Sequence, residues 1–227
     1  MIKKLAFDSE LFGYNVGAMD VTATDERTIT SMLKNSAEYQ LLYVSADNEL
    51  SSSFSDLVLV DIRTRLGKQL GEAVHPVSAD IEEYDGRNEE QLTGLALQSG
   101  LYSRFNTDPG FKGNEFVKLY SKWLAGSLDK SLADKVVVYK EGQDCEGFVT
   151  TKNRSAFLEI GLIAVAEKSR GKGIGSALLN YVDYQATAEG LDKIEVTTQL
   201  TNKPAMHLYQ KAGYKMLSKT YIYHHWK

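Results

Sequence analysis

The chain has little cysteine and no excess of positive charge, and each shortage excludes a class of protein. Its single cysteine, Cys145, excludes an internal disulfide and a zinc site built from several cysteines, which favours a reducing, cytoplasmic setting. The net charge is −4, from 26 basic and 30 acidic residues. No global positive field therefore attracts nucleic acid or an anionic membrane surface. Any polyanionic ligand must be held by a local site.

Long hydrophobic runs are also missing. No segment approaches the roughly 20 apolar residues that a membrane-spanning helix needs, so we expect no membrane insertion. Asp8 and Glu10 closely follow Lys3 and Lys4, so we expect no signal-peptide core at this end. With 227 residues, the chain is long enough for one large domain or two small ones.

Hydrophobic periodicity predicts a small α/β unit over residues 1–70. We expect an irregular loop rich in aromatic residues over 5–21, an amphipathic helix over 22–39, and strands over 41–45 and 57–64. The composition then becomes polar and acidic between Gly67 and Gly86. We place the boundary with a second domain, residues 71–227, in this segment.

The second domain alternates helical and strand patterns. The sequence predicts a mixed α/β fold around one sheet. The expected helices span residues 89–100, 115–128, 177–189 and 205–211. The expected strands are a hairpin over 135–151, single strands over 157–165 and 193–198, and two final strands over 214–225.

A glycine-rich turn stands between the strand at 157–165 and the next helix, and it reads Arg170-Gly171-Lys172-Gly173-Ile174-Gly175-Ser176. A strand, a glycine turn and a helix together aim free backbone N–H groups and a helix dipole at a phosphate. No Lys-Ser/Thr pair follows the last glycine, which excludes a P-loop. The dinucleotide-binding fingerprint does not fit either. Ser176 stands where it has a glycine, and Glu195, the candidate for its acidic ribose partner, lies inside a strand instead of at its end.

This turn resembles the Gln/Arg-x-x-Gly-x-Gly/Ala signature of the GNAT superfamily of N-acetyltransferases, through Arg170, Gly173 and Gly175. A second segment, Asn202 to Tyr214, resembles the family's Asn-x-x-Ala-x-x-x-Tyr-x-Lys-x-Gly-Phe/Tyr motif. The resemblance implies a GNAT acetyltransferase fold, here with an extra N-terminal α/β unit. It also implies acetyl-CoA as co-substrate and no metal.

The resemblance implies a role for each motif. The backbone of the glycine turn holds the pyrophosphate of acetyl-CoA, and the strand before it pairs with the acetyl carbonyl and the pantetheine amides. Tyr209 protonates the departing thiolate, and Asn202 caps its helix and can bond the cofactor arm. Glu159 is a candidate base, directly or through water, with a water chain as the alternative. The predicted cofactor-binding residues are Ile163, Ala164, Val165, Arg170, Gly171, Lys172, Gly173, Ile174, Gly175, Ser176 and Asn202.

Scattered positions indicate the acceptor. Phe12-Gly13 with Asn15, the segment Ser103-Arg104-Phe105, and the aromatic residues Tyr120 and Trp123 resemble the TDP-fucosamine acetyltransferases (WecD-like). This resemblance implies a nucleotide-linked amino sugar as acceptor, with the unit at 1–70 as the wall on the acceptor side. Guanidinium groups bind phosphate in a fork and aromatic rings stack on sugars or bases. The predicted substrate contacts are Phe12, Tyr14, Arg104 and Phe105.

Two other functions stay open. The acceptor is then another amine, such as a protein terminus, a polyamine or an antibiotic, or the chain binds CoA without catalysis. A homodimer is implied by the family resemblance only. Adjacent residues on a strand face opposite sides, so His224 and His225 are not expected to share a metal ion.

Overall fold

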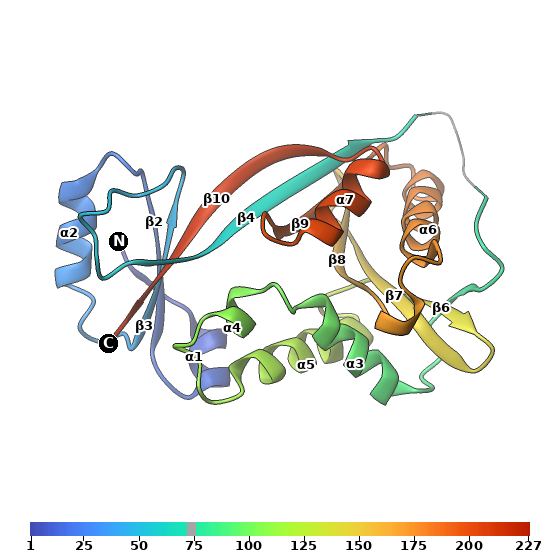
Figure 1. The fold of residues 1–227 in the computed structure, drawn as a ribbon, viewed down its shortest axis with the longest axis horizontal. Helices are drawn as coiled ribbons and strands as arrows, with labels where there is room; N and C mark the ends of the chain where they lie inside the picture. The colour runs from blue at the N-terminus through green and yellow to red at the C-terminus, as the bar shows by residue number, and fades with distance from the viewer. Residues whose placement is uncertain (72–75) are drawn as a thin grey trace.

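The computed structural model describes residues 1–71 and 76–227, and it confirms the predicted mixed α/β class (Figure 1). Residues 72–75 lie inside the predicted boundary segment and outside the described residues. In the described part of the chain, ten strands form one sheet in the order β1-β2-β3-β10-β4-β9-β8-β7-β6-β5. These strands are β1 Lys3–Lys4, β2 Val16–Val21, β3 Leu41–Ala46, β4 Val58–Gln69, β5 Ile81–Glu83, β6 Lys135–Glu141, β7 Asp144–Asn153, β8 Leu158–Val165, β9 Lys193–Gln199 and β10 Lys215–Trp226.

Helices cover both faces of this sheet, and the helices and strands expected over residues 89–211 are present. Buried residues of α6 and α7 pack on one face of β8, whereas α3 and α5 lie on the other face. Figure 1 shows α6 and α7 on one side of the sheet and α3, α4 and α5 along the opposite side. The helices are α1 Ala6–Phe12, α2 Glu26–Lys34, α3 Glu89–Ser99, α4 Arg104–Thr107, α5 Glu115–Leu128, α6 Ile174–Ala188 and α7 Lys203–Lys211, with a 3-10 turn η1 at Glu167–Ser169.

The long strands β4 and β10 connect the two ends of the molecule. Residues 221–226 of β10 pair with β3, residues 215–224 pair with β4, and residues 63–69 of β4 pair with β9. Figure 1 shows these two strands crossing from the end that holds α2, β2 and β3 to the end that holds α6. The two predicted units therefore share one sheet, and their division at residue 70 stays a prediction.

Two local predictions were wrong. Residues 5–21 form α1 and β2 instead of an irregular loop. Helix α1 ends at Phe12 and is followed by Gly13, which has a φ of 81°, and β2 then pairs in parallel with β3. The two strands expected over 214–225 are one strand, β10. Register shifts between Met216 and Ser218, and again between Ile222 and Tyr223, keep it paired with β4 along its length.

Candidate active site

A first cavity, the donor cavity, opens where β8 and β9 diverge. The two strands pair in parallel only from Leu158 to Ile160, beyond which no pairing joins them in the described residues. The cavity has a volume of about 580 Å³ and is bordered by β8, the glycine turn and α7. It is lined, among others, by Ile163, Ala164, Val165, Arg170, Gly171, Gly173, Ile174, Gly175, Ser176, Asn202 and Tyr209.

The diverging edge of β8 presents backbone groups to this cavity. The N–H of Ala166 donates to Glu146 O at 2.8 Å, and the N–H of Leu162 donates to Thr150 Oγ1 at 2.8 Å, both toward β7. Backbone groups alternate in direction along a strand. The N–H and C=O groups of Ile163 and Val165 therefore point to the opposite edge, where β9 has moved away. Such groups can pair with the amides of an extended ligand.

The glycine turn supplies a second set of free donors. Gly171 and Gly173 have φ values of 81° and 87°, in the left-handed region that glycine adopts without strain. Helix α6 begins directly after Gly173, three residues earlier than the sequence predicts, so its start coincides with the turn. The first-turn N–H groups of a helix have no intrahelical acceptor and carry the positive end of the dipole. The turn is therefore a suitable cradle for a pyrophosphate.

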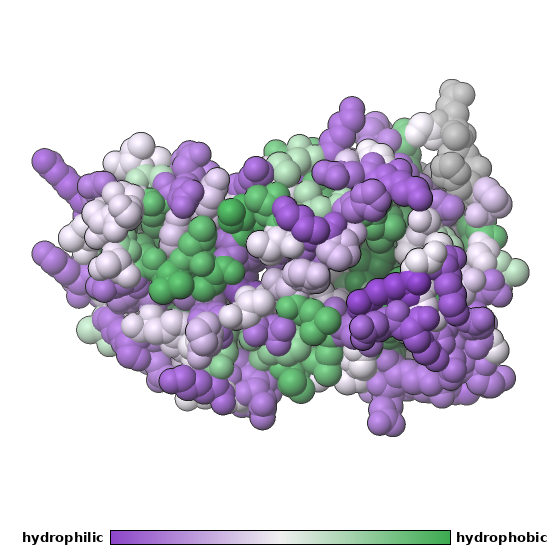
Figure 2. All heavy atoms as spheres, viewed as in Figure 1, coloured by the Kyte–Doolittle hydropathy of each residue, from purple (hydrophilic) through white to green (hydrophobic). Residues whose placement is uncertain are grey.

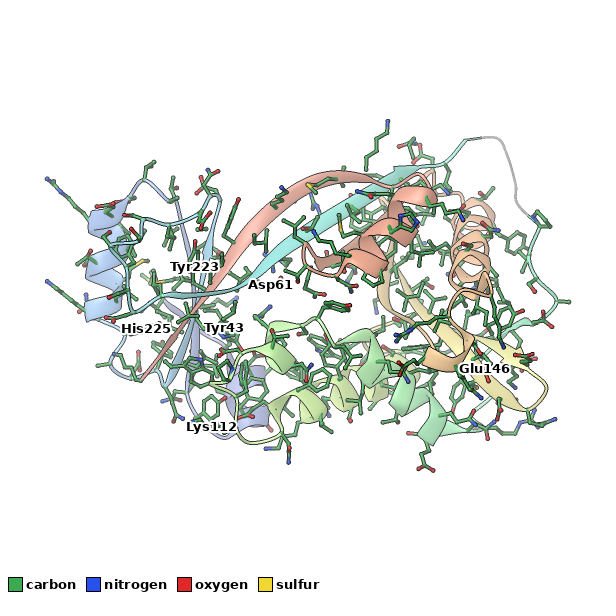
Figure 3. All side chains as sticks on the ribbon, in the orientation of Figure 1. Tyr43, Asp61, Lys112, Glu146, Tyr223 and His225 are labelled. Atoms are coloured by element: carbon green, nitrogen blue, oxygen red, sulfur yellow. The ribbon has the colours of Figure 1, made fainter. Side chains whose placement is uncertain are left out.

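Glu146 on β7 holds the segment before this cradle in place. Its carboxylate accepts a hydrogen bond from Ser169 Oγ at 2.7 Å and lies 2.7 Å from Lys168 Nζ. These two contacts lower the pKa of Glu146, so the carboxylate stays charged. Figure 3 shows Glu146 at the end of the molecule that carries the β6–β7 hairpin.

Side chains of the turn contribute less than its backbone. The Lys172 ammonium lies 3.2 Å from Glu141, and Lys172 is not among the residues that line the cavity. The side chain of Ile174, the first residue of α6, is buried in the core, so the backbone of this residue is the part that faces a ligand. The exposed Arg170 side chain reaches Val165 O at 3.4 Å and Gln98 at 3.5 Å.

Asn202 and Tyr209 lie where the donor cavity meets a second one. Asn202 caps α7 as predicted, because its side chain accepts from the Ala205 N–H at 3.2 Å. Tyr209 is 2% exposed and lines both cavities. Burial raises the pKa of Tyr209, so its phenol is protonated at neutral pH and is able to donate a proton.

The second cavity, the acceptor cavity, has a volume of about 540 Å³ and lies under the bridge made by β4 and β10. It shares Ser99, Ile163, Asn202, Ala205 and Tyr209 with the donor cavity. Its other walls come from α1, β3, β4, α4, α5 and β9. Two ligands, one in each cavity, would therefore meet beside Tyr209.

The predicted acceptor contacts divide into two groups. Arg104 and Phe105 line the acceptor cavity. Phe12 and Tyr14 do not, because Phe12 packs against Phe105 and Phe111 in an aromatic cluster and Tyr14 donates to Glu115 at 3.2 Å. The structure therefore places Phe12 and Tyr14 behind the cavity wall.

Glu159 lies outside the residues that line either cavity. Its carboxylate is 2.6 Å from both Nε and Nη2 of Arg154, at the start of β8 before the strands diverge. An ion-paired carboxylate at this distance from the junction has no direct contact with the reacting groups. The prediction that Glu159 is the base therefore finds no support in the geometry.

The acceptor cavity also contains charged residues that the sequence reading missed. Asp61 and Arg63 enter it from β4, and Asp8 enters it from α1. The sequence contained a signal for Asp61 and Arg63, because the two-residue period of a strand places both on the same face as Leu57 and Leu59. Charged residues on an apolar strand face need partners or a function.

Figure 2 shows several apolar areas across the middle of this face, among hydrophilic residues that prevail toward both ends. Leu101 and Tyr102, between α3 and α4, are exposed and line the donor cavity.

No cluster of three or more His, Cys, Asp and Glu suited to a metal ion occurs in residues 1–71 and 76–227. Among these residues, no helix is both long enough and apolar enough to cross a membrane.

Comparisons with known proteins agree with this geometry. Residues 101–214 match the model of the acetyltransferase (GNAT) family. The spore coat polysaccharide biosynthesis protein SpsD of Bacillus subtilis (strain 168) is 26% identical over 137 residues, covering 60% of this chain and 47% of that protein. N-alpha-acetyltransferase 30 of Xenopus laevis is 30% identical over 88 residues, covering 37% of this chain and 32% of that protein. These matches span less than half the length of either relative.

Two solved structures share nearly the whole fold. A GCN5-related N-acetyltransferase from Sphaerobacter thermophilus aligns with 98% of this chain and 75% of its own, with a TM-score of 0.62 and 15% identity. A functionally unknown conserved protein from Staphylococcus epidermidis ATCC 12228 aligns with 97% of this chain and 88% of its own, with a TM-score of 0.66 and 15% identity. The predicted GNAT fold is therefore confirmed.

Proposed function

The chain belongs to the acetyltransferase (GNAT) family; from this premise, we propose that it is an acetyl-CoA-dependent N-acetyltransferase and that it acetylates the amine of a nucleotide-linked amino sugar similar to TDP-fucosamine. Transfer is direct, within a complex that holds both substrates. The donor binds along β8 and the glycine turn, and the acceptor amine approaches from the opposite side of Tyr209. The cavities that meet at Tyr209 support this arrangement.

One observation carries the acceptor assignment: the guanidinium of Arg104 is held ready for an anion. Its Cζ lies 4.3 Å from the centre of the Phe105 ring and 4.9 Å from that of Tyr43. The Tyr43 ring is in turn fixed, because its hydroxyl donates to Asp8 at 3.0 Å. The Nε of Arg104 is buried and has no hydrogen-bond partner in the described residues. A buried donor without a partner indicates a site for a ligand oxygen.

A second cation strengthens this site. Arg63 lines the same cavity, and partial burial together with the charge of Arg104 lowers the pKa of its guanidinium. Two guanidinium groups that repel each other favour a bound anion between them. The phosphates of a nucleotide sugar supply such an anion, and aromatic rings near the cations suit a base or a sugar. SpsD, whose name refers to polysaccharide biosynthesis, is in accord with a sugar acceptor.

Arg104→Ala tests this assignment. A charge-assisted hydrogen bond contributes about 1.5–3 kcal/mol, so KM for the sugar nucleotide should rise roughly 10- to 100-fold with a small change in kcat. KM for the same amino sugar without its nucleotide should hardly change, because that acceptor carries no phosphate. Steady-state rates of thiol release measure both constants.

Arg87→Ala is the matched control, since Arg87 is exposed and paired with Asp85 outside the cavity. It removes one arginine charge and should leave both KM values as in the wild type. An equal increase in KM for the two acceptors of the Arg104 variant would contradict phosphate recognition by Arg104.

A further inference from the structure

We propose that Asp61 is the carboxylate that binds the ammonium group of the acceptor and takes up its proton before the amine attacks. This inference rests on the N-acetyltransferase function and deepens it, since it names the group that prepares the amine. It applies to any amine acceptor that fills this cavity, whether or not it carries a nucleotide.

The position of Asp61 meets the requirements for this role. Asp61 is 7% exposed and lines the acceptor cavity together with Ile163 and Tyr209. Figure 3 shows it on the part of β4 that bridges the two ends of the molecule. Its Oδ1 is buried and has no hydrogen-bond partner in the described part of the chain. A buried carboxylate oxygen without a donor is costly, and a bound ammonium group would satisfy it.

The backbone next to Asp61 is joined to the turn that precedes α7, the helix that carries Tyr209. The Leu200 N–H donates to Ile62 O at 2.9 Å, beyond the last paired residue of β9. This bond brings the residue after Asp61 to the turn between Leu200 and Asn202, where α7 begins. A proton acceptor on β4 and a proton donor on α7 therefore line the same cavity from two sides.

The arginines near Asp61 form no ion pair with it in the described residues. Arg104 on α4 and Arg63 on β4 both lower its pKa electrostatically, yet neither forms an ion pair with it among the described residues. Tyr120 on α5 also faces it, and Asp8 on α1 lines the same cavity. The carboxylate is thus available to an incoming cation.

The protonation of Asp61 matches the task. Burial raises the pKa of Asp61 to about 6, against the opposing effect of Arg104 and Arg63. Above that pH the group is a carboxylate that binds ammonium and accepts its proton, and below it the protonated acid does neither. Activity that depends on Asp61 is therefore present above about pH 6 and lost as the pH falls through that value.

Two other carboxylates, Asp8 and Glu159, already have hydrogen-bond or ion-pair partners. Asp8 accepts the hydroxyl hydrogen bond of Tyr43, which supports the Arg104 site. Glu159 is paired with Arg154 outside both cavities. Asp61 is therefore the carboxylate of the three that is free to bind the amine.

The protons of the reaction pass between the amine, Asp61 and Tyr209. The ammonium group gives one proton to Asp61, and the neutral nitrogen forms a C–N bond with the acetyl carbon while the C–S bond breaks. Tyr209 protonates the departing sulfur, and the second proton lost by the nitrogen replaces the one that Tyr209 gave. The products are the N-acetyl amine and the thiol, and Asp61 releases its proton to water.

Asp61→Asn tests the proposal on whichever of TDP-fucosamine, glucosamine, spermidine or an unblocked peptide the wild type acetylates fastest. We expect a loss of kcat of about 100-fold or more, since general base catalysis contributes about 10²–10⁴-fold. The fall in kcat/KM below about pH 6 should disappear, and the Kd for acetyl-CoA should stay unchanged. Asp8→Asn and Glu159→Gln serve as comparisons and should keep this fall in kcat/KM at low pH, the acidic limb of the pH profile.

The possible outcomes separate this inference from the proposed acceptor. If the fastest acceptor is another amine and Asp61→Asn still removes the acidic limb, the sugar nucleotide is wrong and the role of Asp61 stands. If the wild type prefers TDP-fucosamine but Asp61→Asn keeps its rate and acidic limb, the role of Asp61 is wrong. Loss of the limb in Glu159→Gln or Asp8→Asn instead would also overturn it, as would no turnover of any of the four amines.

A measurement on the wild type covers the case in which Asp61→Asn does not fold. The test compares the fastest acceptor with its hydroxyl analogue, which carries a hydroxyl in place of the amine; for TDP-fucosamine this analogue is TDP-fucose. We expect binding of the amine, relative to the hydroxyl analogue, to strengthen as the pH rises from about 5 to about 8 with a midpoint near 6. A constant ratio across this range would overturn the proposal.

Discussion

Replacing Tyr209 with phenylalanine is expected to lower kcat by about 10²–10⁴-fold and to leave the Kd for acetyl-CoA nearly unchanged. The phenol is buried at the junction of the two cavities, and burial raises its pKa, so it holds its proton until the thiolate departs. Phenylalanine keeps the ring packing and removes only the hydroxyl group that carries this proton. Single-turnover rates and calorimetric titration with acetyl-CoA measure the two quantities separately.

Tyr214→Phe is the matched control for this change. Tyr214 is also buried, its ring centre lies 5.4 Å from that of Tyr209, and its hydroxyl has no partner within the described residues. It lines neither cavity. The control should therefore keep wild-type kcat, and wild-type turnover in Tyr209→Phe would contradict the acid role.

Replacing Gly173 with valine is expected to weaken acetyl-CoA binding by about tenfold or more. Gly173 has a φ of 87° and directly precedes α6. A left-handed conformation costs a residue with a Cβ about 1–2 kcal/mol, and a β-branched residue is especially strained there. A turn that relaxes out of this conformation moves its N–H groups away from the pyrophosphate, so the cost appears as weaker binding. About 1.4 kcal/mol corresponds to a tenfold change in Kd. Equilibrium binding of acetyl-CoA reports the effect.

Gly190→Val separates loss of binding from loss of stability. Gly190 follows the other end of α6 with a φ of 74°, and, as at Gly173, no atom lies within 4 Å of a Cβ added there. Both variants should have a lower Tm, but only Gly173→Val should have a higher Kd. Equal Kd values in the two variants would show that the turn does not hold the pyrophosphate.

The donor side of the site was predictable from sequence because it depends on the backbone. A turn that needs Gly171 and Gly173, a strand that ends at Val165 and a helix capped by Asn202 all leave local signals. The structure places these segments around one cavity, as the motif implied.

The acceptor side was less predictable because its residues come from distant parts of the chain. Asp61, Arg63 and Tyr43 meet Arg104 only because β10 pairs with both β3 and β4. Phe12 belongs to an aromatic cluster behind the wall, and its sequence pattern does not distinguish packing in a core from contact with a ligand. The best sequence signal for the acceptor side was the alternation along β4, which places Asp61 and Arg63 on the same face as Leu57 and Leu59.

The most direct test of the proposed acceptor is kcat/KM for acetyl-CoA-dependent thiol release across TDP-fucosamine, glucosamine, spermidine and an unblocked peptide. We expect the highest value for TDP-fucosamine, by about tenfold or more over glucosamine, because the phosphate contact with Arg104 contributes at least about 1.5 kcal/mol. A higher value for the peptide or the polyamine would contradict the proposed acceptor, and acetyl-CoA binding without turnover of any amine would contradict the proposed catalysis.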